Sequence, residues 1–275
     1  RATEAPMRTV VMTGAAGGVA RHLRPLLAGA FERLILSDRH APADLRADET
    51  FWAADLADPQ AMLDLLADVD GLIHLGGQSV EGSWAAVHEA NILGLYHAYE
   101  AARRQGVERI VFASSNHAVG FYRRDERIDE DVRPRPDSRY GVSKVFGEAL
   151  GALYARKYGV RTFNIRIGNV AERPADRRRL AMWLHPEDLA QLIRIGLEHP
   201  DVVDDVVYGA SDCERAWWNN RRARELGYRP AHKAEDHLAY ALERQAALPP
   251  DPLGDQFQGG PFCSDEFDGG LAERD

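Results

Sequence analysis

Short runs of β-branched and aliphatic residues alternate along this chain with longer segments of helical periodicity. The apolar runs occupy residues 9–12, 34–36, 71–75, 109–113 and 162–167. Apolar strands separated by amphipathic helices are typical of a parallel sheet that carries helices on both faces. The sequence therefore predicts an α/β fold with a doubly wound parallel sheet.

Helix starts are marked by proline next to polar residues. Asp58 and His185 each precede a proline, which favours a helix with that proline at its first position. Two longer helices, over about residues 83–104 and 140–158, are expected to flank the sheet.

The regular alternation ends near Ile167, and residues 249–275 are rich in proline and glycine. We therefore expect a main domain over residues 7–170. Residues 171–275 should form a small substrate-binding part with an irregular tail, and some of its segments should return to the main domain.

Composition restricts the partners and the compartment. A net charge of -9 argues against a nucleic-acid backbone as the main partner. No apolar run approaches the ~18 residues of a membrane span, and residues 1–7 lack the apolar stretch of a secretory signal. The two cysteines, Cys213 and Cys263, match neither a metal spacing nor a disulfide framework. A cytoplasmic protein without a membrane partner is expected.

A glycine-rich turn directly follows the first apolar run and leads into a helical pattern over residues 21–27. Glycines at such a turn let the backbone approach a pyrophosphate, which is the arrangement of a Rossmann-type dinucleotide site. The predicted contacts in this turn are Gly14, Gly17, Gly18 and Val19.

Asp38 ends the second apolar run, 24 residues after Gly14. A carboxylate there can accept hydrogen bonds from the adenosine ribose and would repel a ribose phosphate, so NAD is favoured over NADP. The adjacent Arg39 leaves dual use open, and Asp38 could instead be a turn residue.

Further cofactor contacts are expected after a third strand that ends before Asp55, and after the fourth strand, which is the apolar run 71–75. Asp55 and Leu56 are suited to the adenine, although Asp55 could be a helix N-cap. Leu75, Gly76 and Gly77 end the fourth strand, where a ribose or nicotinamide must pass closely.

Tyr140 and Lys144 lie four positions apart, on one face of any helix that contains them. Tyr has an unperturbed pKa near ~10, and a neighbouring cation that lowers this pKa makes the phenol a usable base. The pair alone is also compatible with an ordinary amphipathic helix. The surrounding motifs favour a catalytic role.

Several motifs together resemble an extended short-chain dehydrogenase/reductase over residues 7 to about 245. They are Gly14-x-x-Gly17, Asp55, Asn91, Ser114-Ser115 and Tyr140-x-x-x-Lys144. Within that superfamily, five segments resemble the uronate dehydrogenase family. These segments are residues 76–81, 112–117, 140–144, 208–211 with Trp217-Trp218, and 257–260.

This resemblance implies oxidation of a cyclic hexuronic acid, galacturonate or glucuronate, at its anomeric carbon, with NAD as the hydride acceptor and an aldarolactone as product. It implies that Tyr140 is the base and that Lys144 lowers the pKa of Tyr140 and holds the nicotinamide ribose. Ser115 would bond the reacting oxygen, whereas Ser114 would point elsewhere. Asn91 would support a water relay near Lys144, or be an ordinary polar helix residue.

The substrate carboxylate calls for a planar cation, because a guanidinium can donate two parallel hydrogen bonds. Alignment with the family places Arg178 there, although Arg177 and Arg179 remain alternatives. Family positions also imply that Ser79, Asn116 and His117 contact sugar hydroxyls, and that Asn169 replaces a common serine. No metal site is expected, and Trp217-Trp218 is interpreted as packing.

Two other functions remain open. A nucleotide-sugar epimerase or dehydratase would share the cofactor-binding half of the chain. However, the second half of this chain is short for a nucleotide diphosphate sugar. In addition, Asn116-His117 follows the expected active-site serine, where the resemblance to dehydratases would call for an Asp-Glu pair. A non-catalytic NAD-sensing scaffold would be expected to lack Tyr140 or Lys144. The two long helices resemble surfaces through which this superfamily forms homo-oligomers.

Overall fold

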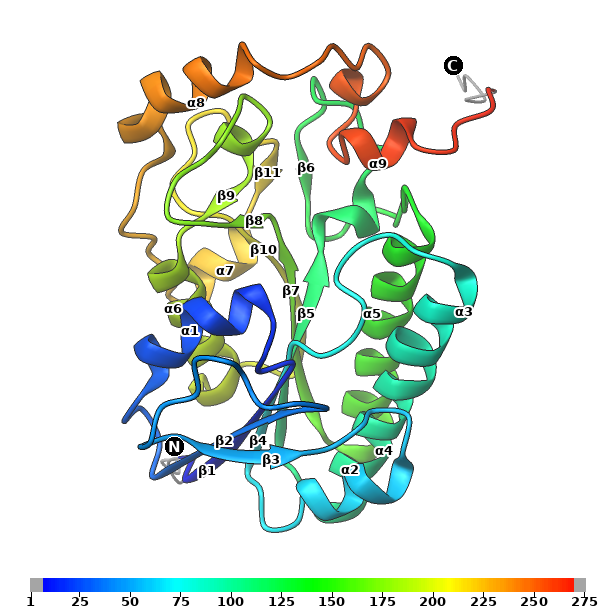
Figure 1. The fold of residues 1–275 in the computed structure, drawn as a ribbon, viewed down its shortest axis with the longest axis vertical. Helices are drawn as coiled ribbons and strands as arrows, with labels where there is room; N and C mark the ends of the chain where they lie inside the picture. Colours follow the sequence, from blue (N-terminus) through cyan, green and yellow to red (C-terminus); the bar gives the residue numbers. More distant parts are fainter. Residues whose placement is uncertain (1–6, 270–275) are drawn as a thin grey trace.

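A seven-stranded parallel sheet forms the centre of the molecule (Figure 1), and the computed structural model describes residues 7–269. The strand order is β10-β7-β5-β4-β1-β2-β3, and every neighbouring pair is parallel. The strands are β1 (Thr9–Thr13), β2 (Arg33–Asp38), β3 (Thr50–Ala53), β4 (Gly71–His74), β5 (Arg109–Ser115), β7 (Arg161–Ile167) and β10 (Asp204–Gly209). The predicted α/β, doubly wound fold is confirmed.

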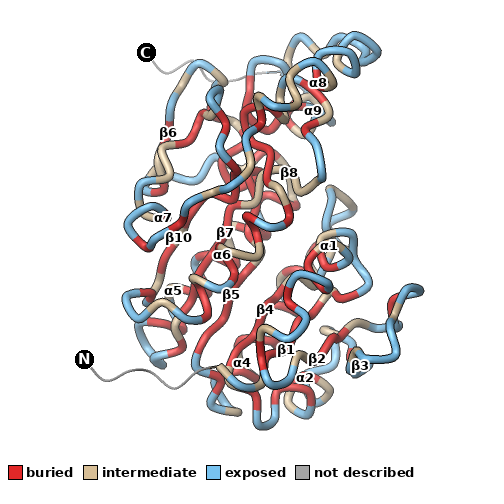
Figure 2. The backbone as a smooth tube through the Cα atoms, turned by 90° about the vertical axis from the view of Figure 1, so that its left-hand side faces the viewer, coloured by how far each residue is buried: buried red, intermediate tan, exposed pale blue. Residues whose placement is uncertain are grey.

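Helices cover both faces of the sheet and bury two separate apolar cores. One face carries α1 (Gly18–Leu27) and α6 (Pro186–Glu198), and the other carries α2 (Pro59–Leu65), α4 (Gly94–Gln105) and α5 (Arg139–Tyr158). Val10 lies in the first core and Val11 in the second, both fully buried. The inner strands β1, β4 and β5 are covered on both faces and are buried along nearly their whole length (Figure 2), whereas the edge strand β3 is largely exposed.

The two proline-marked helix starts are confirmed. The Asp58 carboxylate caps α2 by accepting hydrogen bonds from the backbone N–H groups of Gln60 and Ala61. The His185 ring caps α6 by accepting from the N–H of Glu187. In both cases a side chain satisfies N–H groups that the helix itself leaves unpaired.

The helix expected over residues 83–104 is present but contains a change of winding. It begins after the Ser83 cap with α3 (Trp84–Val87), continues as a π-helical segment η1 (His88–Leu93) and ends as α4. Such segments insert an extra residue into a helical turn and are frequent at functional sites. Hydrophobic periodicity does not register this single-turn change.

Residues beyond 170 contribute to the sheet and, together with β6 (Ile128–Asp129) and β8 (Asn169–Val170), form a layer above its carboxyl edge. Strand β10 joins the sheet, α6 packs on it and α7 (Arg221–Glu225) packs beside β10, whereas the remaining elements lie toward the carboxyl ends of the strands (Figure 1). These are β11 (Trp218–Asn219), which pairs with β6, β9 (Trp183–Leu184), which pairs with β8, η3 (Arg179–Ala181), η4 (Ala234–His237), α8 (Leu238–Gln245), η5 (Gly254–Gln256) and α9 (Pro261–Ser264). Among the described helices, none is long and apolar enough to cross a membrane.

Candidate active site

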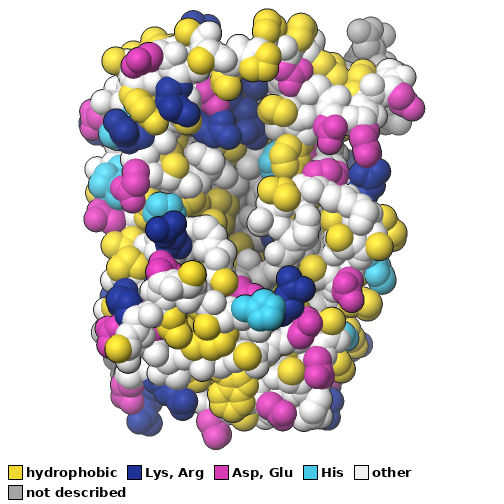
Figure 3. Space-filling view, in the orientation of Figure 1, with side chains coloured by type: hydrophobic (Ala, Val, Ile, Leu, Met, Phe, Trp, Pro, Cys, Tyr) yellow, Lys and Arg dark blue, Asp and Glu magenta, His cyan; other side chains and the backbone are white. Residues whose placement is uncertain are grey.

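A cavity of about 540 Å³ opens at the carboxyl ends of β1, β2 and β4, where the strand order reverses. Ligands of doubly wound sheets bind at this reversal point. Figure 3 shows the molecule hollowed between its lower and upper parts, with Lys and Arg side chains gathered at the upper end of the hollow. The predicted cofactor residues that line this cavity are Gly14, Gly17, Gly18, Val19, Asp38, Asp55, Leu56, Leu75, Gly76 and Gly77.

The first glycine of the turn, Gly14, has no room for a side chain. Gly14 has φ +71°, and a Cβ there would come within 2.7 Å of the backbone of Leu75 and Gly76. Helix α1 begins at Gly18, three residues before the predicted start at Arg21, because the end of the glycine turn forms its first helical turn. The free N–H groups of that turn make the cavity fit a pyrophosphate.

The Asp38 carboxylate fixes the glycine turn and faces the same cavity. Its Oδ2 accepts the N–H of Ala16 at 3.1 Å and its Oδ1 accepts the N–H of Arg39 at 2.8 Å. Each carboxylate oxygen keeps a further acceptor position. The group can therefore bond a ribose hydroxyl, and Arg39 lines the cavity beside it.

Asn91 lines neither this cavity nor its neighbour. Its Oδ1 accepts the N–H of Gln78 at 2.7 Å, and its Nδ2 donates to the Gln78 carbonyl and to the Ser143 hydroxyl. The π-helical segment η1 thus ties the loop after β4 to α5. A cofactor role for Asn91 stays a prediction, and an indirect one.

A second cavity, of about 240 Å³, adjoins the first and shares Val19, Leu75, Gln78 and Ser79 with it. It is bounded by the ends of β5 and β7 and by the start of α5. The predicted residues that line it are Ser79, Ser115, Asn116, His117, Tyr140, Lys144 and Asn169. Residues from five distant parts of the chain therefore meet beside the cofactor cavity.

Tyr140 and Lys144 are both buried where α5 passes β5. Lys144 Nζ donates to the Ala113 carbonyl at 2.7 Å and lies 5.2 Å from the centre of the Tyr140 ring. Burial raises the pKa of Tyr140 to about 12, although the Ser115 hydroxyl bonded to the phenol opposes this. Loss of hydration is therefore the largest influence on this phenol, and the lowering of its pKa by Lys144 stays a prediction.

Burial also lowers the pKa of Lys144 from 10.5 to about 8. At pH 7 the folded state thus holds a poorly hydrated cation, at a cost of about 3 kcal/mol relative to the unfolded chain. We expect Lys144→Met to lose turnover and yet to have a free energy of unfolding about 1–2 kcal/mol higher than the parent. The substitution removes the cost of the buried ammonium, whereas the hydrogen bond that is lost with it contributes only about 1 kcal/mol.

The pH dependence of this stability gain identifies its cause. The cost of the buried ammonium is fully present below pH 8 and disappears as pH rises toward 10.5, the ordinary pKa of Lys. Urea unfolding of both proteins at pH 7 and above pH 9 should show the gain shrinking. A Lys144→Met protein less stable than the parent at every pH would contradict this account.

The two serines that end β5 have different partners. Ser115 accepts the N–H of His117 at 3.1 Å and bonds the Tyr140 phenol. Ser114 donates to Glu148 Oε1 at 2.7 Å, and Arg166 pairs with the same carboxylate. The hydroxyl of Ser115 therefore joins the phenol, and that of Ser114 belongs to a buried ion-pair network.

The tautomer of His117 is fixed by a buried carboxylate. His117 Nδ1 lies 2.6 Å from Asp137 Oδ2, and the side chain of Asp137 is fully buried. A carboxylate only accepts hydrogen bonds, so Nδ1 carries the proton, while burial lowers the pKa of His117. The neutral ring then keeps Nε2 as an acceptor for a sugar hydroxyl.

Among the three consecutive arginines, Arg178 bonds Asn116, a residue that lines the second cavity, although Arg178 itself is not part of that lining. Its Nη2 donates to Asn116 Oδ1 at 3.0 Å, and its Nε donates to the Gln258 carbonyl at 2.8 Å. Arg177 is exposed, and Arg179 pairs with Asp176. Burial and the charges of neighbouring arginines lower the pKa of Arg178 to about 10, and no carboxylate in residues 7–269 forms an ion pair with it.

Three residues near the substrate cavity carry no clear signal in the sequence. Gln78 lines both cavities, Asp137 orients His117, and Phe262 stacks on the His117 ring with centroids 3.8 Å apart. Only Gln78 belongs to a motif that the family resemblance contains. Asp137 and Phe262 lie 20 and 145 positions after His117, so no local pattern connects them to it.

The Trp217-Trp218 pair packs away from both cavities, as interpreted from the sequence. Both side chains are buried in a core with Tyr208, whose ring stacks on Trp218 with centroids 4.6 Å apart. The Trp218 indole N–H donates to Gln258 Oε1 at 3.0 Å.

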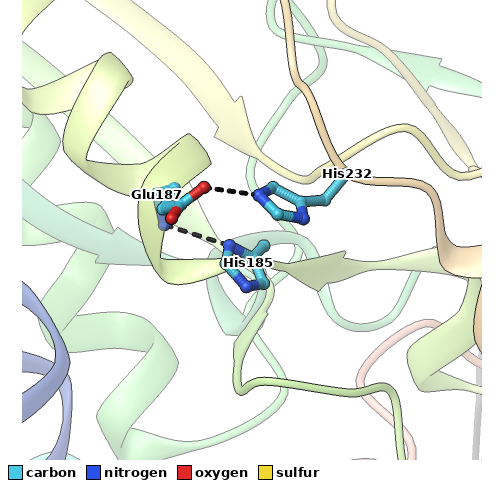
Figure 4. A group of neighbouring side chains, drawn as sticks. All are labelled: His185, Glu187 and His232. Carbon is cyan, nitrogen blue, oxygen red and sulfur yellow. Dashed lines mark hydrogen bonds and ion pairs between the residues drawn. The ribbon is translucent and has the colours of Figure 1, made fainter.

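Outside these cavities, His185, Glu187 and His232 form a group with the composition of a metal site (Figure 4). Present contacts already occupy these ligand atoms. The His185 Nδ1 accepts the N–H of Glu187, and Glu187 Oε2 lies 2.7 Å from His232 Nε2. A cation here would also face the N-terminus of α6, whose dipole repels it. The prediction of no metal site stays a prediction.

Comparison with protein families gives a match over residues 10–181 to the NAD dependent epimerase/dehydratase family. The uronate dehydrogenase of Pseudomonas putida is 46% identical over 263 residues, which cover 95% of this chain and 97% of that protein.

Two solved structures have nearly the same fold. The glucuronic acid dehydrogenase of Chromohalobacter salexigens superposes with a TM-score of 0.90 at 43% identity, covering 94% of this chain and 97% of its own. A tyrosine-to-alanine mutant of the Agrobacterium tumefaciens uronate dehydrogenase, in complex with NAD, superposes with a TM-score of 0.89 at 40% identity and covers 94% and 98%.

Proposed function

This chain belongs to the NAD dependent epimerase/dehydratase family and, within it, to the uronate dehydrogenases, and from this membership we propose that it oxidises a cyclic hexuronic acid at the anomeric carbon. The product is an aldarolactone, because the anomeric carbon already carries the ring oxygen when its hydroxyl becomes a carbonyl. NAD, when bound in the larger cavity, supplies the hydride acceptor.

The proton and the hydride leave the substrate in different directions. Tyr140, as the phenolate, takes the proton of the anomeric hydroxyl while the C–H hydride departs and the C=O bond forms. Ser115 bonds the phenol and is positioned to share a hydrogen bond with the same oxygen. Lys144 supplies a positive charge 5.2 Å from the Tyr140 ring, which opposes the cost of ionising a buried phenol.

The observation that carries the choice of substrate is the Arg178 guanidinium. A poorly hydrated cation without a carboxylate partner among residues 7–269 is costly, and an incoming carboxylate removes that cost by forming charge-assisted hydrogen bonds. Arg178 bonds Asn116, and Asn116 lines the second cavity together with His117 and Asn169, whose polar groups suit sugar hydroxyls. A neutral sugar would leave the guanidinium unpaired.

A nucleotide-sugar epimerase is disfavoured by the size of the second cavity. At about 240 Å³ it is smaller than the ~300–1,000 Å³ pockets that hold larger ligands, so it fits one hexose ring better than a nucleotide diphosphate sugar. A non-catalytic NAD sensor is disfavoured because Tyr140, Lys144 and Ser115 all converge on this cavity.

The decisive experiment mixes purified protein with NAD and galacturonate or glucuronate and follows NADH absorbance. We expect NADH to form together with a lactone, and NADP to be a poorer acceptor because Asp38 would repel a ribose phosphate. Turnover of a nucleotide sugar in the absence of uronate oxidation would favour the epimerase instead. NAD binding without turnover of either would favour the sensor.

We also propose that the protein is a cytoplasmic homo-oligomer that associates through η1, α4 and α5. Large apolar side chains are exposed on these elements: Leu93 and Tyr96 on one side, and Val142, Leu153 and Tyr158 along α5. Apolar side chains gathered on two neighbouring helices are typical of a subunit interface. A monomeric mass by light scattering would contradict this proposal. The free thiols of Cys213 and Cys263 support a reducing compartment.

A further inference from the structure

The C-terminal segment 257–262 packs against the substrate cavity, far in sequence from the other residues around it. It lies above the carboxyl edge of the sheet, between β6 and the start of α5 (Figure 1). Two side chains of the proposed site contact it directly: Arg178 through the Gln258 carbonyl, and His117 through the ring of Phe262. The mechanism proposed above assigns no role to this segment.

The segment is held in place by buried hydrogen bonds to the main domain. Gln258 is fully buried, and its side chain accepts from the Trp218 indole and donates to the carbonyls of Arg123 and Glu126. Its own N–H donates to the Tyr122 carbonyl at 2.9 Å. With both its peptide N–H and its side chain fixed, the Gln258 carbonyl is a rigid acceptor for Arg178.

The two glycines that follow make room for the charged groups of the cavity. A Cβ on Gly259 would lie 2.0 Å from Asp137 Oδ2, the oxygen that bonds His117. A Cβ on Gly260 would lie 2.7 Å from Cδ and Nε of Arg178. Gly260 also has φ +62° and ψ -132°, a conformation that only glycine adopts readily.

We propose that residues 257–262 are the specificity-determining element of this site and that Gly260 is a positioning residue for the Arg178 guanidinium. The Gln258 carbonyl and the Asn116 amide fix the guanidinium plane at two of its nitrogens, which leaves Nη1 and the second hydrogen of Nη2 for the substrate carboxylate. The His117 ring is held from two sides as well, because Phe262 stacks on its face and Asp137 bonds Nδ1 at its edge. The inference rests on the proposed uronate oxidation.

The test is the variant Gly260→Ala in the full chain. The new methyl group must displace Arg178, so we expect KM for galacturonate to rise about ten- to a hundredfold, with a smaller change in kcat. The dissociation constant for NAD should stay the same, because the segment lies outside the cofactor cavity. Oxidation of galactose, which lacks the carboxylate, should be slow in the parent and unchanged in the variant.

The matched control is Gly269→Ala. Gly269 also has a positive φ, +99°, but a Cβ there would meet nothing within 4 Å. This control carries the same kind of backbone strain without touching Arg178, and its KM for galacturonate should equal that of the parent.

A double-mutant cycle separates positioning from general damage. In an Arg178→Ala background, Gly260→Ala should have no further effect on KM, because the group through which it acts is gone. Additive losses, or a selectivity for galacturonate over galactose that Gly260→Ala leaves unchanged, would overturn the inference. The proposed function would fail separately, if the parent protein itself did not oxidise galacturonate.

Discussion

Tyr140→Phe is expected to lower kcat about 10³- to 10⁴-fold and to leave NAD binding within about twofold of the parent. The substitution removes one oxygen atom, the proton acceptor of the reaction, and a positioned base contributes on the order of 10²–10⁴ in rate. The ring itself keeps its contacts with His117 and Phe262, so the fold should be preserved. Steady-state NADH formation and NAD titration measure the two quantities.

The pH profile provides a second measure of the same role. Burial holds the pKa of Tyr140 near 12, so the phenolate fraction, and with it kcat/KM, should rise with pH over the neutral and mildly alkaline range. Tyr140→Phe should abolish this rise. Tyr158→Phe is the control, because Tyr158 is an exposed tyrosine at the far end of α5. A Tyr140→Phe enzyme with parental kcat would remove Tyr140 as the base.

Arg178→Ala is expected to lower kcat/KM for galacturonate about 10²- to 10³-fold, mainly through KM. The variant leaves the substrate carboxylate buried without its cation, and an uncompensated buried charge costs about 3–5 kcal/mol. Arg178→Lys should recover only part of the loss, because an ammonium keeps the charge but cannot donate two parallel hydrogen bonds.

Arg177→Ala is the matched control for this prediction. Arg177 is the preceding residue and equally charged, but it is exposed and bonds Gln245 through its backbone N–H only. Its KM for galacturonate should equal the parental value. If Arg177→Ala or an Arg179 variant weakened uronate binding and Arg178→Ala did not, the carboxylate site would have to be moved to that arginine.

Most of the sheet was predictable because its inner strands are apolar on both faces, whereas β10 begins with two aspartates and was not among the predicted strands. Runs such as residues 109–113 cannot form exposed or half-exposed strands, and the Asp58 and His185 caps mark where helices begin. Details that depend on tertiary contact were not predictable. The π-helical turn carries Asn91, which bonds Gln78 outside the helix, and α1 begins early because its first turn is part of the glycine loop.

The residues that line the larger cavity could be predicted from the sequence because they follow strand ends that the sequence marks, and their contacts with the cofactor stay a prediction. Family position brought Arg178 into consideration, but only the structure separates it from Arg177 and Arg179. Asp137 and Phe262 could not be predicted from the sequence, because they belong to the site through contacts with the His117 ring, which lies 20 and 145 positions before them. The raised pKa of Tyr140 was not predictable, because a sequence does not report how much water surrounds a phenol.

The anchoring of segment 257–262 also governs how the two halves of the site are assembled. The glycine turn and its neighbours meet over short chain separations, whereas the bonds from Arg124 to Phe257 and from Cys263 to Gly120 span 133 and 143 residues. Closing such long loops carries more entropy loss than closing short ones, and peripheral segments open before a core does. Mild denaturation would then leave a protein that still sequesters NAD but oxidises nothing. Coenzyme retention is consequently a poor assay for an intact enzyme of this architecture.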